Sequence, residues 1–345
     1  MDRKIKAISV GVGAMGSCGL KYMLDHGIDV VAAVDKYKDG VGAHDVNADI
    51  EAGRVIIEAD LDAVLERERP DIAFIATETE VPKIYPLAMK CIEAGVNVAT
   101  ISEEAFYPWY LEKELAEKLD DACKANGVTM YASGIQDVFG SAIPMALAAS
   151  CNRVDRFHGY NFQPLEDMGL VVAQNFYLGE SCDEANKKLA ELSELGNSET
   201  RVFMLAILAN CEILGLKTTH VRMKVEALPA PFELDCPQWN MVIAKGACVG
   251  LRCSCHVDTE EGIPWDHSID FAVTTDPKKE PPITEWYIDG DPNMHIRTDN
   301  MTGEVTTTAS VVNRIPDIIA AEPGYKTVAD MGPARYKAES AEKYL

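Results

Sequence analysis

The sequence predicts an α/β protein, in which a doubly wound parallel sheet is followed by an α+β second domain with a mixed or antiparallel sheet. Three observations predict it. A glycine-rich turn joins a short apolar run to an amphipathic segment near the start of the chain. Apolar runs and helical spacing then alternate as far as about residue 132, whereas beyond residue 144 strand-like runs follow one another with few helices between them. Alternation is typical of a parallel sheet, and successive strands indicate an α+β domain.

The first predicted unit is residues 4–35. A strand at residues 5–10 leads into a turn with three spaced glycines, a helix that ends at Gly27, and a second strand at residues 28–34 that is followed by an acid. In a Rossmann-type unit the glycines permit the tight turn, the approach of a pyrophosphate and close helix packing, while the acid binds the ribose. The phosphates lie on the helix N-terminus. We therefore predict that a dinucleotide is bound by Gly11, Gly13, Ala14, Met15, Gly16 and Asp35.

The rest of the first domain follows the same alternation. Strands are predicted at residues 54–58, 71–76, 96–101 and 128–131, and helices at 61–67, 81–93 and 109–125. Ligands of an open parallel sheet lie outside the carboxyl ends of its strands. By this rule we assign Thr77 and Thr79, after the fourth strand, to the cofactor, and Gln136, Asp137 and Phe139, after the sixth, to the substrate.

Two adjacent acids, Glu103 and Glu104, follow the fifth strand. An acid beside a hydride-transfer centre can exchange a proton with the substrate if partial burial raises its pKa towards neutrality. Alternatively, the two glutamates begin a solvated helix, where acids favour the positive end of the dipole. The sequence leaves both interpretations open.

The second half of the chain predicts strands at residues 156–163, 220–228, 247–259, 269–275, 285–288 and 294–298, with helices from residue 181 and at 202–216. A helix at residues 311–321 is expected to return towards the first domain. We therefore divide the chain into a dinucleotide-binding domain (1–140), a substrate and oligomerisation domain (141–305) and a C-terminal segment (306–345). His158 and Thr307 are assigned to the substrate and Asn313 to the cofactor, although histidines on strands are often structural and the threonines at 306–308 also fit a polar strand end.

Composition restricts the partners. The formal charge of −23 argues against nucleic acid and anionic membranes, but helix N–H groups can still hold phosphate. The negative charge also suits a cationic substrate, or it serves solubility alone.

No apolar run reaches the roughly 18 to 20 residues that span a bilayer, and the ten cysteines show no disulfide spacing, so we expect a cytoplasmic protein with reduced thiols. We expect a homo-oligomer, because the apolar segment 202–216 and an open sheet each offer an interface.

Local residues bear on the choice between NAD and NADP and on metal binding. The carboxylate of Asp35 repels a 2′-phosphate, which favours NAD over NADP, although Lys36 and Lys38 partly offset it. A metal is not expected, because Cys253-Ser-Cys255-His256 has no second ligand pair.

Several short motifs in this order resemble one family. The segments GVGAMGS, TISEEAFYPW, SGIQDVFG, EDMG and VVNRIP resemble those of 2,4-diaminopentanoate dehydrogenase and the related native amine dehydrogenases, whose architecture is similar to that of dihydrodipicolinate reductase. The resemblance covers most of the chain and is weakest in the second domain and the tail YKTVADMGPARYKAES. The histidine-rich helix and SGTA signature of dihydrodipicolinate reductase are absent.

The resemblance implies reversible NAD(P)-dependent oxidative deamination of a small amine or diamino acid to a ketone and ammonia, with 2,4-diaminopentanoate as the leading substrate. A glutamate at the end of the fifth strand acts on the amine in that family, and it corresponds to Glu103 or Glu104. The alternatives are an imine or enamine reductase of the dihydrodipicolinate reductase type and a non-catalytic NAD-sensing protein.

Overall fold

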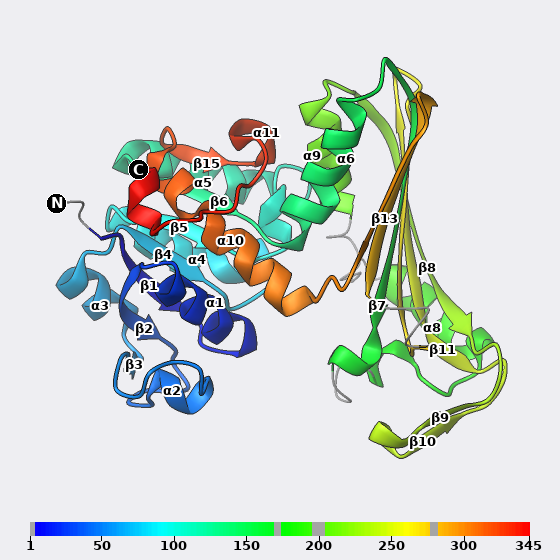
Figure 1. Cartoon of the computed structure of the whole chain (residues 1–345), viewed down its shortest axis with the longest axis horizontal. Helices are drawn as coiled ribbons and strands as arrows, with labels where there is room; N and C mark the ends of the chain where they lie inside the picture. Colours follow the sequence, from blue (N-terminus) through cyan, green and yellow to red (C-terminus); the bar gives the residue numbers. More distant parts are fainter. Residues whose placement is uncertain (1–3, 169–173, 195–203, 277–281) are drawn as a thin grey trace. The chain divides into compact units, whose positions relative to one another are not determined.

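The computed structural model describes residues 4–168, 174–194, 204–276 and 282–345. The chain divides into two compact units (Figure 1). Unit 1 comprises Met1–Ala142, Leu208–Ile213 and Gly303–Leu345, and unit 2 comprises Ile143–Ile207 and Leu214–Thr302. Unit 1 is therefore assembled from three separate stretches of sequence.

Unit 1 is built on a parallel sheet. In the part of the chain that the structure describes, its strand order is β15 (Gly324–Lys326), β6 (Thr129–Ala132), β5 (Asn97–Thr100), β4 (Ile72–Ile75), β1 (Lys6–Val10), β2 (Asp29–Val34) and β3 (Ile57–Glu58). Every neighbouring pair is parallel. The strand order reverses at β1, which is where such sheets bind dinucleotides. The predicted doubly wound sheet is confirmed, and the three-residue β15 is added to it.

Helices cover both faces of this sheet. On one face Ile8 and Val10 of β1 share a core with α3, α4 and α5, and on the other Ala7 shares a core with Leu20 of α1 and Ile315 of α10. Figure 1 shows α1 and α10 lying side by side. Successive side chains of a strand point to opposite faces, so β1 serves both cores. The helical elements of unit 1 are α1 (Ala14–Asp25), α2 (Ala43–Val46), α3 (Leu61–Glu68), α4 (Val81–Glu93), η1 (Glu104–Phe106), α5 (Lys113–Asn126), η2 (Gln136–Ala142), α10 (Gly303–Ala320), α11 (Val328–Met331) and η7 (Ala341–Tyr344).

Helix α10 begins eight residues before the predicted start at residue 311. The threonines at 306–308 lie inside it, so the strand-end interpretation is wrong. Thr308 Oγ1 donates to the carbonyl of Glu304 at 2.8 Å, and Ser310 Oγ donates to that of Thr306 at 2.7 Å. Because hydroxyl groups in a helix can bond to the preceding turn in this way, a polar run does not exclude a helix.

Unit 2 is built on a mixed sheet with the order β14 (Met294–Asp299), β13 (Ile283–Asp291), β7 (Arg153–Pro164), β12 (Trp265–Ala272), β11 (Cys248–Thr259) and β8 (Thr218–Pro229). Strands β7 and β12 pair in parallel, and the other pairs are antiparallel. The α+β second domain is confirmed. Its remaining elements are α6 (Ile143–Ala148), η3 (Leu165–Met168), η4 (Gln174–Phe176), α8 (Cys182–Glu194), the hairpin β9 (Leu234–Cys236) and β10 (Met241–Ile243), and η6 (Pro237–Trp239).

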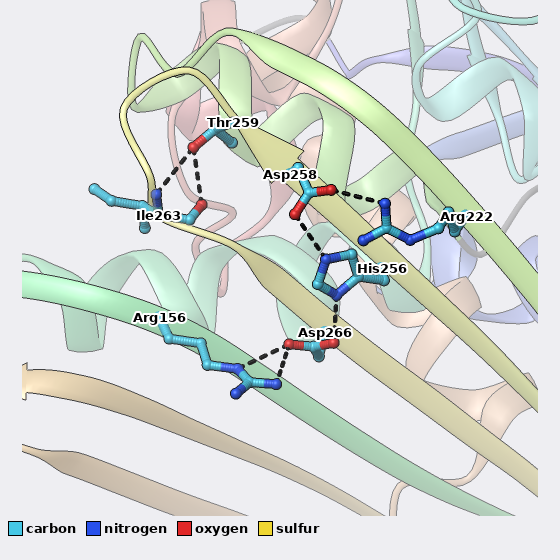
Figure 2. A network of polar contacts seen from close by, with 7 residues as sticks. All are labelled: Arg156, Arg222, His256, Asp258, Thr259, Ile263 and Asp266. Atoms are coloured by element: carbon cyan, nitrogen blue, oxygen red, sulfur yellow. Dashed lines mark hydrogen bonds and ion pairs between the residues drawn. The ribbon is translucent and has the colours of Figure 1, made fainter.

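A chain of charged groups crosses four strands on the half-exposed face of this sheet (Figure 2). Arg222 of β8 pairs with Asp258 at 2.8 Å, and His256 lies between Asp258 and Asp266, at 2.9 and 2.7 Å. Asp266 also accepts a hydrogen bond from Arg156 of β7 at 2.8 Å. Hydrogen bonds to Asp266 and Asp258 raise the pKa of His256. The two arginines therefore balance the charges of the two aspartates within the network, and His256 lies between the two carboxylates.

The cysteines beside His256 lie on the other face of β11. Cys253 and Cys255 are buried, whereas His256 is half-exposed between two carboxylates, so the three side chains do not converge. Over the described ranges, no cluster of three or more His, Cys, Asp or Glu residues is arranged to hold a metal.

The apolar segment predicted at residues 202–216 contains α9 (Leu205–Ile213). Residues 204–211 are buried within this chain, so they are not a free surface for another copy. The homo-oligomer stays a prediction, which then rests on the open sheet alone. Among the helices that the structure describes, none is both long and apolar enough to cross a membrane.

Candidate active site

The glycine-rich turn between β1 and α1 is closed on its inner side and open at Gly13. A Cβ on Gly11, which has φ +87°, would lie 2.5 Å from the carbonyl oxygen of Ala76, and a Cβ on Gly16 would lie 2.0 Å from that of Gly11. A Cβ on Gly13 would have no neighbour within 4 Å. Helix α1 follows with no side-chain cap and no acid in its first turn. Its N–H groups and the bare backbone at Gly13 therefore suit the pyrophosphate of a dinucleotide.

Asp35 stands at the end of β2 and is tied to the same turn. Its Oδ2 accepts from the backbone N–H of Val12 and from Lys38 Nζ, both at 3.1 Å, and its Oδ1 accepts from the N–H of Tyr37 at 3.0 Å. Burial alone would raise the pKa of Asp35, but the N–H groups of Tyr37 and Val12 and the Lys38 ammonium hold it below its usual value. Asp35 is thus an ionised, fixed acceptor beside the turn.

The loops after β4 and β5 are joined to each other. The carbonyl of Thr79 accepts from Ser102 Oγ at 2.5 Å and from the N–H of Glu104 at 3.2 Å. Thr77 is exposed, and its Cγ2 lies 2.7 Å from the position that a Gly11 Cβ would take. The structure therefore brings both threonines to the edge of the sheet that carries the glycine-rich turn.

Glu103 and Glu104 are both half-buried directly beyond β5. A three-residue 3-10 helix, η1, begins at Glu104 with Glu103 as its N-cap residue, but both side chains are half-buried and not fully solvated. One oxygen of Glu104, Oε2, accepts from the N–H of Val81 at 2.7 Å. Val81 is the first residue of α4, whose N-cap residue, Glu80, makes no side-chain cap. Glu104 therefore caps α4, and this bond distinguishes it from Glu103.

The turn after β6 points Asp137 inward. Asp137 is fully buried and accepts from Arg314 Nε at 2.8 Å and Arg314 Nη2 at 2.7 Å, from the Tyr131 hydroxyl at 3.0 Å and from Ser133 Oγ at 2.9 Å. Protein donors thus surround the carboxylate that the sequence assigned to the substrate. Gln136 and Phe139 are half-buried in the same turn.

Helix α10 contributes the two remaining candidates of unit 1. Thr307 lies next to the turn, because its Cγ2 is 3.1 Å from the position of a Cβ on Gly134. Asn313 bonds to the protein at both ends of its amide: Nδ2 donates to the carbonyl of Ala309 at 2.9 Å, and Oδ1 accepts from the N–H of Lys337 at 3.0 Å. Asn313 therefore fastens the C-terminal segment to α10.

The histidines of unit 2 fall on different surfaces. His158 is exposed on β7, with its ring edge-on to Tyr287. His267 of β12 instead stacks on Trp286, with ring centroids 5.3 Å apart, and its Nε2 is 3.1 Å from Asn161 Oδ1. Burial lowers the pKa of His267 to about 4. His267 is therefore a neutral imidazole within a polar and aromatic cluster of unit 2.

Sequence reasoning missed two buried partners, Arg314 and Asn210. Arg314 is the one charged residue in the apolar segment 311–316, and Asn210 interrupts an apolar helix. A polar residue in such a setting is a usable signal, because burial without a partner is costly. The sequence does not show which residue each of them contacts.

Comparison with known proteins shows which sequences this chain resembles. A family model described as the 2,4-diaminopentanoate dehydrogenase C-terminal domain matches residues 141–344. The 2,4-diaminopentanoate dehydrogenase of Acetoanaerobium sticklandii is 26% identical over 338 residues, which are 95% of this chain and 93% of that protein.

Solved structures give the same result for the fold. The amine dehydrogenase from Mycobacterium smegmatis matches with a TM-score of 0.83 and 29% identity, over 98% of each chain. The myo-inositol 2-dehydrogenase from Lactobacillus plantarum shares the fold, with a TM-score of 0.61 and 14% identity over 99% of this chain and 95% of that one. The family model spans more than half of the sequence, and the resemblance seen in the motifs is confirmed. The chain therefore belongs to the 2,4-diaminopentanoate dehydrogenase family.

Proposed function

We propose that this protein is a dehydrogenase that uses NAD or NADP to convert the C–NH2 group of a small amine or diamino acid into a ketone and ammonia, or catalyses the reverse reductive amination. The leading substrate is 2,4-diaminopentanoate, which the relative from Acetoanaerobium sticklandii is named for. The observation that carries the proposal is the carboxylate pair Glu103–Glu104 directly beyond β5, in the sheet whose first turn fits a dinucleotide.

The chain supplies the binding groups for the cofactor. The open backbone at Gly13 and the N-terminus of α1 would hold the pyrophosphate, and Asp35 would accept from a ribose hydroxyl. A nicotinamide held by these residues would supply the hydride acceptor for the reaction. Because Asp35 is an ionised acceptor fixed beside the turn, we expect NAD to bind more tightly than NADP, whose 2′-phosphate would meet a negative charge.

The carboxylate pair supplies the proton chemistry. One carboxylate accepts a proton from the substrate ammonium, and the neutral amine that remains uses its lone pair to expel hydride from carbon. Water then adds to the iminium carbon and ammonia leaves. One substrate ammonium ion, one oxidised cofactor and one water thus give ketone, ammonium ion, reduced cofactor and one proton. The formal charge of −23 suits a cationic substrate.

The test is turnover with a panel of diamino acids and simple amines, followed spectroscopically with NAD and with NADP. Turnover with a hydroxy acid or a cyclic imine but with no amine would overturn the proposal. A reductive reaction that needs no ammonium would identify an imine reductase. Tight NADH binding without any turnover would indicate a sensing protein.

Single substitutions test the carboxylates. Either Glu103→Gln or Glu104→Gln should abolish amine turnover while the dissociation constant for NADH stays within about twofold, because the proposed pyrophosphate and ribose contacts follow β1 and β2. Glutamine at 104 keeps an oxygen that can accept from Val81, so the cap of α4 survives. Glu114→Gln, on an exposed position of α5, is the matched control for loss of one charge. Full activity in both variants would refute the assigned role.

A further inference from the structure

The turn η2 (Gln136–Ala142) is π-helical and continues into α6. π-Helices are rare, occur mostly as single turns and are frequent at functional sites. Seven residues in this form need outside support, because an α-helix would satisfy the same backbone groups with better geometry. The contacts on the inner side of η2 supply that support.

Two fully buried side chains, four residues apart, anchor η2 from within unit 1. Asp137 is held by Arg314 of α10, whose Nη2 also donates to the carbonyl of Gly332 at 2.6 Å. Ser141 Oγ donates to Asn210 Oδ1 of α9. Asp137 is thus fixed to α10 and Ser141 to α9, in each case by a contact between residues that are far apart in the sequence.

Asn210 makes two hydrogen bonds to η2. Besides accepting from Ser141, it donates through Nδ2 to the carbonyl of Gly140 at 2.8 Å. Its side chain is fully buried on a helix whose neighbouring residues are apolar. Placing an amide there is unfavourable unless its partners are present, so Asn210 makes sense as a support for η2 and not as part of the apolar core.

Gln136 and Phe139, the two remaining substrate candidates of η2, keep partial exposure. Gly134, with φ +154°, leads into the turn, and Thr307 of α10 lies against it. Gly134, Gln136 and Phe139 follow β6, the neighbour of β5 in the parallel sheet, so they lie on the same edge of the sheet as Glu103 and Glu104. An anchored turn at this edge is a suitable platform for a ligand.

We propose that η2 is a pre-organised substrate-binding turn, in which Asn210 and the Asp137–Arg314 pair are positioning residues. The amide of Gln136 binds the polar substituent of the amine substrate, and the ring of Phe139 packs on its carbon chain. This inference rests on the proposed function for the identity of the substrate, but the order of η2 can be measured without it.

The experiment compares Asn210→Leu with wild type in the full-length protein. Asn210→Leu removes both bonds to η2, so the KM for the amine should rise roughly tenfold, as expected for one lost hydrogen-bonded support, with the NADH dissociation constant within about twofold. Hydrogen exchange of the amides at 136–142 should accelerate at least about tenfold, while exchange in α1 stays unchanged. Asn210→Gln, which keeps the amide, should recover part of both effects.

A matched control separates positioning from general loss of stability. Leu208→Val on the same helix loses one buried methylene and should reduce stability without raising KM or the exchange rate at 136–142. In addition, Gln136→Ala should raise KM on its own and have little further effect when combined with Asn210→Leu, because both act through one contact.

Two results would overturn the inference: unchanged exchange at 136–142 in Asn210→Leu, or additive effects of Gln136→Ala and Asn210→Leu on KM. If no amine is turned over by wild type, the proposed function fails, and the exchange measurement still decides whether Asn210 orders η2. The KM comparison is then made with the substrate that is turned over.

Discussion

Replacing Asp137 by asparagine tests the buried ion pair that fixes the end of β6. The carboxylate accepts four hydrogen bonds, two of them from Arg314, and the side chains of Asp137 and Arg314 are 0% and 1% exposed. A neutral amide in place of the carboxylate would leave the guanidinium buried without a counter-charge. Breaking one side of such a pair costs about 3–5 kcal/mol. We therefore expect Asp137→Asn to lower the free energy of unfolding by that amount.

The assay is urea unfolding followed by circular dichroism. With a urea dependence of about 1–3 kcal/mol/M, the midpoint of the transition that includes unit 1 should fall by at least about 1 M. The double variant Asp137→Asn with Arg314→Met should recover much of this loss, because no unpaired charge remains. If Asp137→Asn is as stable as wild type but has a raised KM for the amine, this reasoning is refuted, and Asp137 is a substrate-binding residue.

Three further outcomes are expected. Glu104→Ala should cost about 0.5–2 kcal/mol in urea unfolding, because α4 loses the acceptor for its first N–H, and Glu104→Gln should cost clearly less; equal losses would contradict this. Asp35→Ser should shift the NADPH-to-NADH affinity ratio, measured by fluorescence titration, towards NADPH by about tenfold, since the Lys38 ammonium is freed for a 2′-phosphate; an unchanged ratio counts against it. The pKa of His267 falls from 6.5 in the unfolded chain to about 4 in the folded protein, so only the unfolded chain gains a proton between these values. The free energy of unfolding should therefore decline by up to about 3 kcal/mol as pH drops through this window. In His267→Gln, the urea midpoint should change less with pH over the same window.

The dinucleotide unit is predictable from the sequence because its requirements are local. A strand, three glycines, a helix and an acid lie within residues 4–35, and each has a known role in binding a dinucleotide. The alternation of short apolar runs with helical spacing likewise predicts the parallel sheet. Glu103 and Glu104 follow from the rule that ligands meet the carboxyl ends of strands.

What the sequence does not show depends on contacts between distant segments. Asp137 and Arg314 are 177 positions apart, so nothing near Asp137 indicates that its carboxylate is already paired. Glu104 looks like its neighbour in sequence, and only the fold places Val81 beside it. His158 and His267 lie on different strands, and only the pairing register, which sets His158 beside Asp266 and His267 beside Gly159, places them on opposite faces of the sheet. The roles of single polar side chains are therefore the least predictable part of the site.

Unit 1 is completed by a segment, Gly303–Leu345, that follows unit 2 in the sequence. Helix α10, which packs against α1, and strand β15, which extends the sheet beyond β6, both come from Gly303–Leu345. During synthesis residues up to 142 leave the ribosome with α1 but not α10 on one face of the sheet, and all of unit 2, which ends at Thr302, is made before α10 can complete that face. The order in which the two domains can be completed is thus the reverse of their order in the gene, and a truncation before Gly303 removes part of the dinucleotide domain.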